Sequence, residues 1–231
     1  MSGYLLFVAH YLLERGLSRR YACDVAKSGA DLLEPMTDTN ITHQWVSKFD
    51  ADTARAVVSL VDCASSDGGP LGYAQPMSPD EADVFITGLK RRVTTGEAHV
   101  LLGRAGVQLA FLGVLTCNGM TNCRHRAELS KGVVHPEFRG RRFVQLAFQE
   151  MVRRAADLGV DQFVLDVREG SRAHVLWQRF GFESYGILND YARIGGKSYP
   201  GHFMVQSVAS LSAHLSAAHH ESTQQKDDIH V

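Results

Sequence analysis

The sequence is poor in cysteine, and its few cysteines are not arranged as a metal-binding or redox motif. Cys23, Cys63, Cys117 and Cys123 form no C-x-x-C pair, and the spacing of the last two is not a metal signature. Four cysteines in 231 residues also do not suggest a disulfide scaffold. We therefore expect free thiols in a reducing cytoplasm and no metal site.

An excess of one charge is also absent, as is any long hydrophobic run. The chain has 24 basic and 25 acidic residues, so its net charge of −1 offers no cationic field for nucleic acid or an anionic membrane. The apolar stretch over residues 4–13 is interrupted by His10, is too short to span a bilayer, and has no basic leader or cleavage site. We expect a cytoplasmic protein that binds neither nucleic acid nor a membrane.

Patterns of helices and strands alternate along the chain. Ser78-Pro-Asp-Glu places serine at an N-cap, proline at the first helical position and glutamate at the third, which predicts a helix to about residue 95. Further helices are predicted from the Asp50 cap to about residue 64, over 141–158, and over 173–180 behind a Ser171 cap. Strands are predicted over 41–48, 99–102, 107–117 (after a turn at 103–106), 128–134, 163–167, 183–187 and 202–206. This order predicts an α/β protein of the α+β type with a mixed sheet.

Three segments follow from these patterns. Residues 1–40 carry apolar residues at helical spacing and are expected to form a helical extension. The extension is too rich in Leu and Tyr for a free arm, so we expect it to pack on the core or on a second subunit, which leaves monomer and homodimer both open. Residues 41–208 form the domain that contains the sheet, with a Gly- and Pro-rich loop at 66–78. Residues 209–231 are expected to be a flexible, polar, His-rich tail.

One strand-to-helix junction has the features of an anion site. Residues 132–147 read GVVHPEFRGRRFVQLA, a strand end followed by a short turn and the start of a helix. Several backbone N–H groups at such a start lack an internal partner and point to one place, where the helix dipole also favours an anion. Arg139, Arg141 and Arg142 cluster at the same point, and an anion would relieve their repulsion. The junction therefore predicts a phosphate site.

The same residues resemble the GNAT superfamily of acyl-CoA N-acyltransferases, and the flanking stretches LDVR at 165–168 and DYAR at 190–193 look like a subgroup of small-molecule acetyltransferases. Val134 to Gly140 follows the family's Val-x-Pro-x-x-Arg-Gly run, and 170–182 is similar to its Asn-x-x-Ala-x-x-x-Tyr-x-x-x-Gly-Phe helix. The resemblance implies the GNAT fold, a twisted, mixed and mostly antiparallel sheet flanked by helices and splayed after the strands that end at Val134 and Val167. It also implies the residues that bind the donor: Val133, Val134, Arg139, Gly140, Arg141, Arg142, Phe143 and Val144.

The chain departs from the family pattern at four positions. Arg142 and Val144 replace small residues that allow a pyrophosphate to approach the backbone closely, and Gly170 replaces the asparagine. Trp177 replaces the tyrosine that often protonates the leaving thiolate, and tryptophan is not an acid. The donor is therefore either acyl-CoA or an acyl group on the phosphopantetheine arm of an acyl-carrier protein, whose acidic surface would suit the arginines.

Three residues are candidates for catalysis. Glu128 resembles in position the family's general base, which takes a proton from the acceptor amine; the alternative is a strand glutamate paired with Arg124 or Arg126. Tyr185 and Tyr191 are candidates for the acid, although each could be a packed aromatic residue.

The predicted function is transfer of an acyl group from a pantetheine thioester to the amine of a small molecule, in natural-product biosynthesis or resistance. Two alternatives remain open: an enzyme that depends on a carrier protein and does not use CoA, and a non-catalytic module that binds acyl-CoA or pantetheine.

Overall fold

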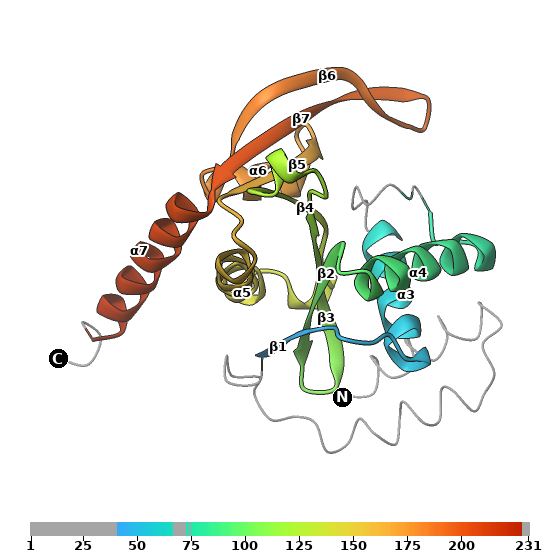
Figure 1. The fold of residues 1–231 in the computed structure, drawn as a ribbon, viewed down its shortest axis with the longest axis horizontal. Helices are drawn as coiled ribbons and strands as arrows, with labels where there is room; N and C mark the ends of the chain where they lie inside the picture. Colours follow the sequence, from blue (N-terminus) through green and yellow to red (C-terminus); the bar gives the residue numbers. More distant parts are fainter. Residues whose placement is uncertain (1–40, 67–72, 74, 228–231) are drawn as a thin grey trace, which may run out of the picture. The chain divides into compact units, whose positions relative to one another are not determined.

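A seven-stranded sheet forms the centre of the part of the chain that the computed structural model describes, residues 41–66, 73 and 75–227 (Figure 1). The strands are β1 (Ile41–Trp45), β2 (Ala98–Ala105), β3 (Gln108–Cys117), β4 (Arg126–Val134), β5 (Gln162–Arg168), β6 (Glu183–Ile194) and β7 (Lys197–Ser207). The helices are α3 (Ala51–Ser66), α4 (Pro79–Thr94), α5 (Phe143–Leu158), α6 (Arg172–Arg179) and α7 (Val208–Asp227), with 3-10 turns η2 (Thr121–Cys123) and η3 (Pro136–Phe138). The expected helical extension over 1–40 and most of the loop at 66–78 lie outside the described residues.

The strand order is β1-β2-β3-β4-β5-β7-β6, and every pair is antiparallel except β4 with β5. This confirms the predicted mixed, mostly antiparallel sheet. Helices α3 and α4 cover one face over a core that includes Val57, Leu89 and Val114. Helices α5 and α7 cover the other face, where the largest buried side chains are Phe143 and Phe163 (Figure 1).

Local sequence signals set the ends of the helices. At α4 the predicted capping box is present, because the Ser78 hydroxyl accepts from the backbone N–H of Glu81 while the Glu81 carboxylate accepts from the backbone N–H of Ser78. The Asp50 carboxylate accepts from the N–H of Thr53 at 2.7 Å, and Ser171 caps α6 in the same way. Gly159 ends α5 in the left-handed conformation, with φ of 66°.

The turn predicted at residues 103–106 is wrong, because β2 continues through Gly103 to Ala105. A Cβ at Gly103 would lie 2.8 Å from the Cβ of Phe111 and 2.9 Å from Nε2 of His43. The glycine is therefore needed for close packing between neighbouring strands, and the reversal of the chain falls at Gly106, where φ is 57°.

The C-terminal hairpin and the helix that follows it are longer than the sequence indicated. Strands β6 and β7 form an extended hairpin around Gly195 and Gly196, both with positive φ. The chain after Val208 forms helix α7 where a frayed tail was expected from Leu211. That expectation is wrong for the first turns of the helix, because Leu211 and Leu215 are 0% and 3% exposed and pack in the core beneath α5.

His43 joins the edge strand β1 to the start of α5. Its ring lies edge-on to Phe111 and Phe143, with centroid distances of 5.7 and 6.0 Å, and it is hydrogen-bonded to the backbone of Phe143. Burial lowers the pKa of His43 from 6.5 to about 4. The folded protein therefore holds this histidine neutral at a pH where the unfolded chain would protonate it.

A pH dependence of stability follows from this difference. The contribution of His43 is fully present above pH 6.5 and is lost as the pH falls from 6.5 to about 4, because the unfolded state then binds the proton first. Between pH 7 and 4.5 we expect the unfolding free energy of wild type to fall by about 2 kcal/mol more than that of His43→Leu. This figure includes a reduction for the partial exposure of the His43 ring. Urea denaturation of both proteins at the two pH values measures this, and parallel losses in the two proteins would contradict the assignment.

Candidate functional site

Strands β4 and β5 part from each other early. They pair in parallel only at Arg126 with Gln162, Ala127 with Phe163, and Glu128 with Val164. Beyond that point β4 continues to Val134 and β5 to Arg168, each still paired with its other neighbour. The predicted splay is confirmed, and it opens earlier than the strand ends at Val134 and Val167. The facing edges of both strands consequently present backbone groups to the gap.

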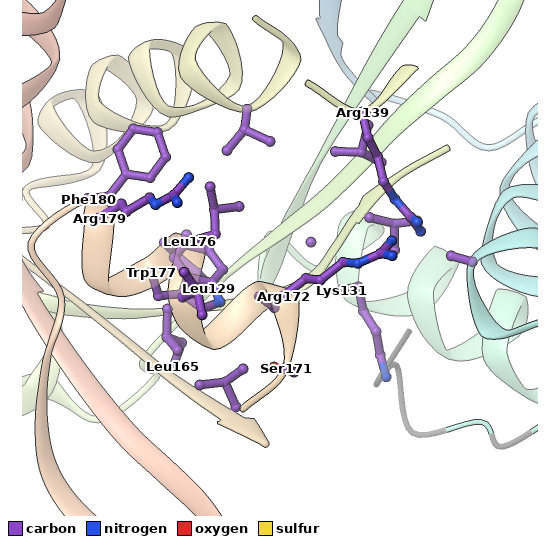
Figure 2. A pocket seen from close by; sticks show the side chains of 18 of the residues that line it. Leu129, Lys131, Arg139, Leu165, Ser171, Arg172, Leu176, Trp177, Arg179 and Phe180 are labelled. Atoms are coloured by element: carbon purple, nitrogen blue, oxygen red, sulfur yellow. The ribbon is translucent and has the colours of Figure 1, made fainter. Parts of the chain in front are cut away.

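A cavity of about 980 Å³ occupies this gap, bounded by the loop before α5 and by helix α6 (Figure 2). Seven of the eight residues predicted to bind the donor line it: Val133, Val134, Arg139, Gly140, Arg141, Arg142 and Val144. The eighth, Phe143, is fully buried below the loop, against Phe138 and His43. Its side chain anchors the loop and does not reach the cavity.

The start of α5 has no side-chain cap. No side chain caps the helix at Arg142, and the N–H of Leu146 makes its first internal bond, to the carbonyl of Arg142 at 3.0 Å. The amides of the first turn therefore remain available to a ligand. Gly140, with φ of 76°, makes the preceding turn. We refer to residues 139–145 as the anion loop.

Side chains from other elements add charge at the same place. Arg172, from the first turn of α6, also lines the cavity, and in Figure 2 its side chain and that of Arg139 point toward one another. Arg141 lies over the Phe138 ring, with its guanidinium carbon 5.2 Å from the centroid. Arg172 could not be recognised from the sequence as part of this site, because only the fold brings α6 beside the anion loop.

A group of polar residues, which we call the carboxylate cluster, lies where β4 and β5 part. It consists of Glu128, Lys131, Asp166 and Tyr191, and two of its members, Lys131 and Asp166, also line the cavity. Partial burial and the charge of Asp166 raise the pKa of Glu128, while Arg92 and Lys131 oppose the shift. Glu128 keeps contact with solvent on the sheet face that carries Arg92 of α4. The cavity thus extends from the anion loop to Lys131 and Asp166 of the carboxylate cluster, and Glu128 lies beside them.

A bulge in β4 places Lys131 in this cluster. The register between β3 and β4 shifts between Leu112 and Val114, and Lys131 has φ of 53°, unusual for a residue other than glycine. Such strain persists only where the surrounding structure enforces it, and it often accompanies a functional site. Burial lowers the pKa of Lys131, whereas the charges of Asp166 and Glu128 raise it.

The two tyrosines proposed as acids differ in their surroundings. Tyr191 donates its hydroxyl to the Asp166 carboxylate, and its ring lies on Gly201, where an added Cβ would come within 2.1 Å of the ring. Partial burial and the bond to Asp166 raise the pKa of Tyr191. Tyr185 is 64% exposed, lies 6.4 Å from the Phe203 ring and is not among the residues that line the cavity.

Trp177 fills the position at which the resembling family carries a tyrosine. Its ring packs against Phe148 and Phe182, at centroid distances of 5.3 and 5.0 Å. A Cβ on Gly132 of β4 would lie 3.7 Å from Cζ2 of Trp177, which is ordinary contact. Trp177 therefore forms an apolar wall of the cavity beside the bulge in β4.

A model of the acetyltransferase (GNAT) family matches residues 32–182. The chain belongs to this family. It is therefore an acyltransferase, from a family that uses acyl-CoA as the donor.

Solved structures of GNAT proteins share the fold. YncA from Salmonella typhimurium, solved with its cofactor acetyl-CoA, is 16% identical with a TM-score of 0.60, over 73% of this chain and 94% of that one. A GNAT acetyltransferase from Streptococcus pneumoniae is 18% identical with a TM-score of 0.58, and the match covers 72% of this chain and 99% of that one. A ribosomal-protein-alanine N-acetyltransferase from Brucella melitensis is also 18% identical, with a TM-score of 0.58 over 72% and 98%.

No curated protein matches the sequence. In the described part of this GNAT protein, no helix is both long and apolar enough to cross a membrane.

Proposed function

We propose that the protein transfers an acyl group from acyl-CoA to the amine of a small molecule. One observation supports this above the others: a single cavity joins the anion loop, where a phosphate can bind, to the carboxylate cluster, where an amine can lose a proton. The reaction requires a site that binds the donor and a group that takes the proton of the amine. The anion loop and the carboxylate cluster would meet these requirements, and the gap between β4 and β5 lies between them.

The donor fits the cavity in size and in charge. A volume of about 980 Å³ is at the upper end of small-molecule sites, which suits a long nucleotide donor. The pyrophosphate would bind to the uncapped amides of α5 and to Arg139 and Arg172, and the pantetheine amides would pair with the free edges of β4 and β5. Arg142 and Val144 are among the residues that line the cavity. The cavity has its volume of about 980 Å³ with these larger residues in place, so they leave room for a donor.

The chemistry follows from this arrangement. The amine nitrogen attacks the thioester carbonyl carbon, a carbon–nitrogen bond forms, and the carbon–sulfur bond breaks to release a thiolate. A backbone N–H of β4 near Val134 stabilises the oxyanion of the tetrahedral intermediate. Glu128 accepts the proton that the amine loses, directly or through water. Its pKa is raised toward neutral pH, which is the direction that makes a carboxylate a better general base.

The departing sulfur needs little help from the protein. A thiol is a much stronger acid than an alcohol, and the cysteine thiol, for example, has a pKa of about 8.5, so a thiolate is a good leaving group. Partial burial and the bond to Asp166 raise the pKa of Tyr191 and make it a weaker acid than an ordinary tyrosine, and Tyr185 lies away from the cavity. We therefore propose that Tyr191 orients Asp166 and that the thiolate takes its proton from water.

The first test is thiol release. Acetyl-CoA with a panel of small primary amines should release free CoA thiol only when an accepting amine is present, and calorimetry should show micromolar binding of acetyl-CoA. The same acyl group on a carrier protein is the comparison. Full turnover with CoA would exclude the carrier donor. Turnover only with the carrier, lost on Arg141→Glu, would overturn the CoA proposal. Tight donor binding without turnover on any amine would favour a non-catalytic module.

A further inference from the structure

A small apolar chamber opens from the donor cavity on the α5 side of the sheet. It has a volume of about 60 Å³ and lies between β3, β4, α5 and α6. The chamber and the cavity share Gly132, Val144 and Trp177, so their walls are continuous. A donor that runs from the anion loop to the carboxylate cluster would pass this opening at the bulge in β4.

The walls of the chamber accept only apolar groups. None of its lining residues is charged, and the hydroxyl of Ser130 and the indole N–H of Trp177 are the polar side-chain groups among them, while Phe148 and Met151 are 5% and 3% exposed. A water molecule in such a space would lack the two to four polar partners that hold buried water. The chamber is therefore suited to hydrocarbon.

Two glycines keep the chamber open. A Cβ at Gly113 would lie 2.8 Å from Cε of Met151, so a larger residue there would displace the Met151 side chain that lines the chamber. At Gly132 a Cβ would make only ordinary contact with Trp177 and would project toward the chamber. Trp177, in place of the family's tyrosine, makes the wall beside Gly132 apolar, because an indole ring carries no hydroxyl there.

We propose that this chamber binds the acyl chain of the donor, and that the enzyme prefers an unbranched aliphatic acyl group longer than acetyl. A space of about 60 Å³ is several times what one water needs, which is enough for about two to four methylene groups. Butanoyl and hexanoyl groups have two and four carbons more than acetyl. The proposal rests on the proposed function, since it concerns the donor of that same reaction.

The experiment compares acetyl-CoA, butanoyl-CoA and hexanoyl-CoA with one accepting amine. Each buried methylene is worth about fourfold (0.8 kcal/mol), so kcat/KM for butanoyl-CoA should exceed that for acetyl-CoA by about 15-fold. Calorimetric Kd values without the amine should follow the same order. Equal or falling values with chain length would overturn the inference while leaving acyl transfer intact. A rise in affinity without any turnover would support the chamber and count against the proposed function.

Variants locate the effect. Gly132→Ala should lower the ratio of butanoyl to acetyl kcat/KM about fourfold, because one methyl group fills part of the chamber. Ala173→Leu narrows the chamber from α6 and provides the same test if the β4 variant does not fold. Gly186→Ala is the matched control: this strand glycine has nothing within 4 Å of an added Cβ and lies outside the chamber, so the ratio should stay at the wild-type value. An unchanged ratio in both chamber variants would overturn the assignment.

Discussion

Glu128→Gln is expected to lower kcat by about 10- to 10⁴-fold at neutral pH while leaving the affinity for acyl-CoA nearly unchanged. Glutamine keeps the size of the side chain but cannot take the proton of the amine. Donor affinity should persist because the Glu128 side chain lies beside the cavity and is not among the residues that line it. Steady-state thiol release gives kcat, and calorimetry gives the Kd of the donor.

The pH dependence of the same variant separates catalysis from simple disturbance of the site. Partial burial and Asp166 raise the pKa of Glu128. As the pH is lowered, wild-type activity should therefore begin to fall at a higher pH than that at which an ordinary carboxyl group is protonated. The loss in Glu128→Gln should shrink at high pH, where the free amine is already neutral. Glu183→Gln, at an exposed strand position outside the cavity, is the matched control and should behave as wild type. Unchanged kcat in Glu128→Gln would show that Glu128 is not the base and that bulk water takes the proton.

Phe143→Ala should destabilise the fold by about 3–5 kcal/mol and also weaken donor binding. The Phe143 side chain is fully buried at the first position of α5, between Phe138 and His43. Without the ring, the anion loop loses its anchor. Each backbone hydrogen bond to phosphate that is lost costs about 1.5–3 kcal/mol, or at least tenfold in Kd. Urea denaturation and calorimetry with acetyl-CoA measure the two effects.

Phe163→Ala provides the control for this prediction. Phe163 is equally buried, but it lies in β5 where the strand still pairs with β4, away from the anion loop. Its loss should cost similar stability with far less change in donor Kd when both variants are measured at a temperature where they are folded. Phe143→Leu keeps most of the volume and should cost less than about 1.5 kcal/mol, so it can be used if the alanine variant is too unstable. Equal donor affinities in the two alanine variants would show that the ring does not position the loop.

The anion loop was predictable from sequence because its cause is local. A strand end, Pro136, Gly140 and the apolar pattern of α5 follow each other within a few residues, and each has a definite backbone preference. The capped starts of α4 and α6 were predictable for the same reason. The one misplaced residue, Phe143, belongs to the right segment, but its side chain points into the core.

Glu128 and Tyr191 of the carboxylate cluster were candidates from the sequence, but their meeting with Asp166 and Lys131 was not predictable. Asp166 and Lys131 reach it because β5 pairs beside β4 and because a bulge turns Lys131 out of register. Tyr191 reaches it across the hairpin, over a glycine on the neighbouring strand. These are contacts between residues far apart in sequence, and a single sequence does not fix strand register at that distance. Helix α7 was missed because its buried face rests on Leu211 and Leu215 in an otherwise polar stretch.

The early parting of β4 and β5 also bears on how the protein holds together. Only three residue pairs join β1–β4 to β5–β7 within the sheet, so the seam between these two groups of strands is its weakest line. Helix α7 follows β7 and packs on α5, so it connects the two groups of strands across that seam. A donor whose amides pair with both open edges would serve as a missing strand, and its binding energy would add directly to the free energy of folding. A donor bound in this way would be a structural component of the folded protein as well as a reactant.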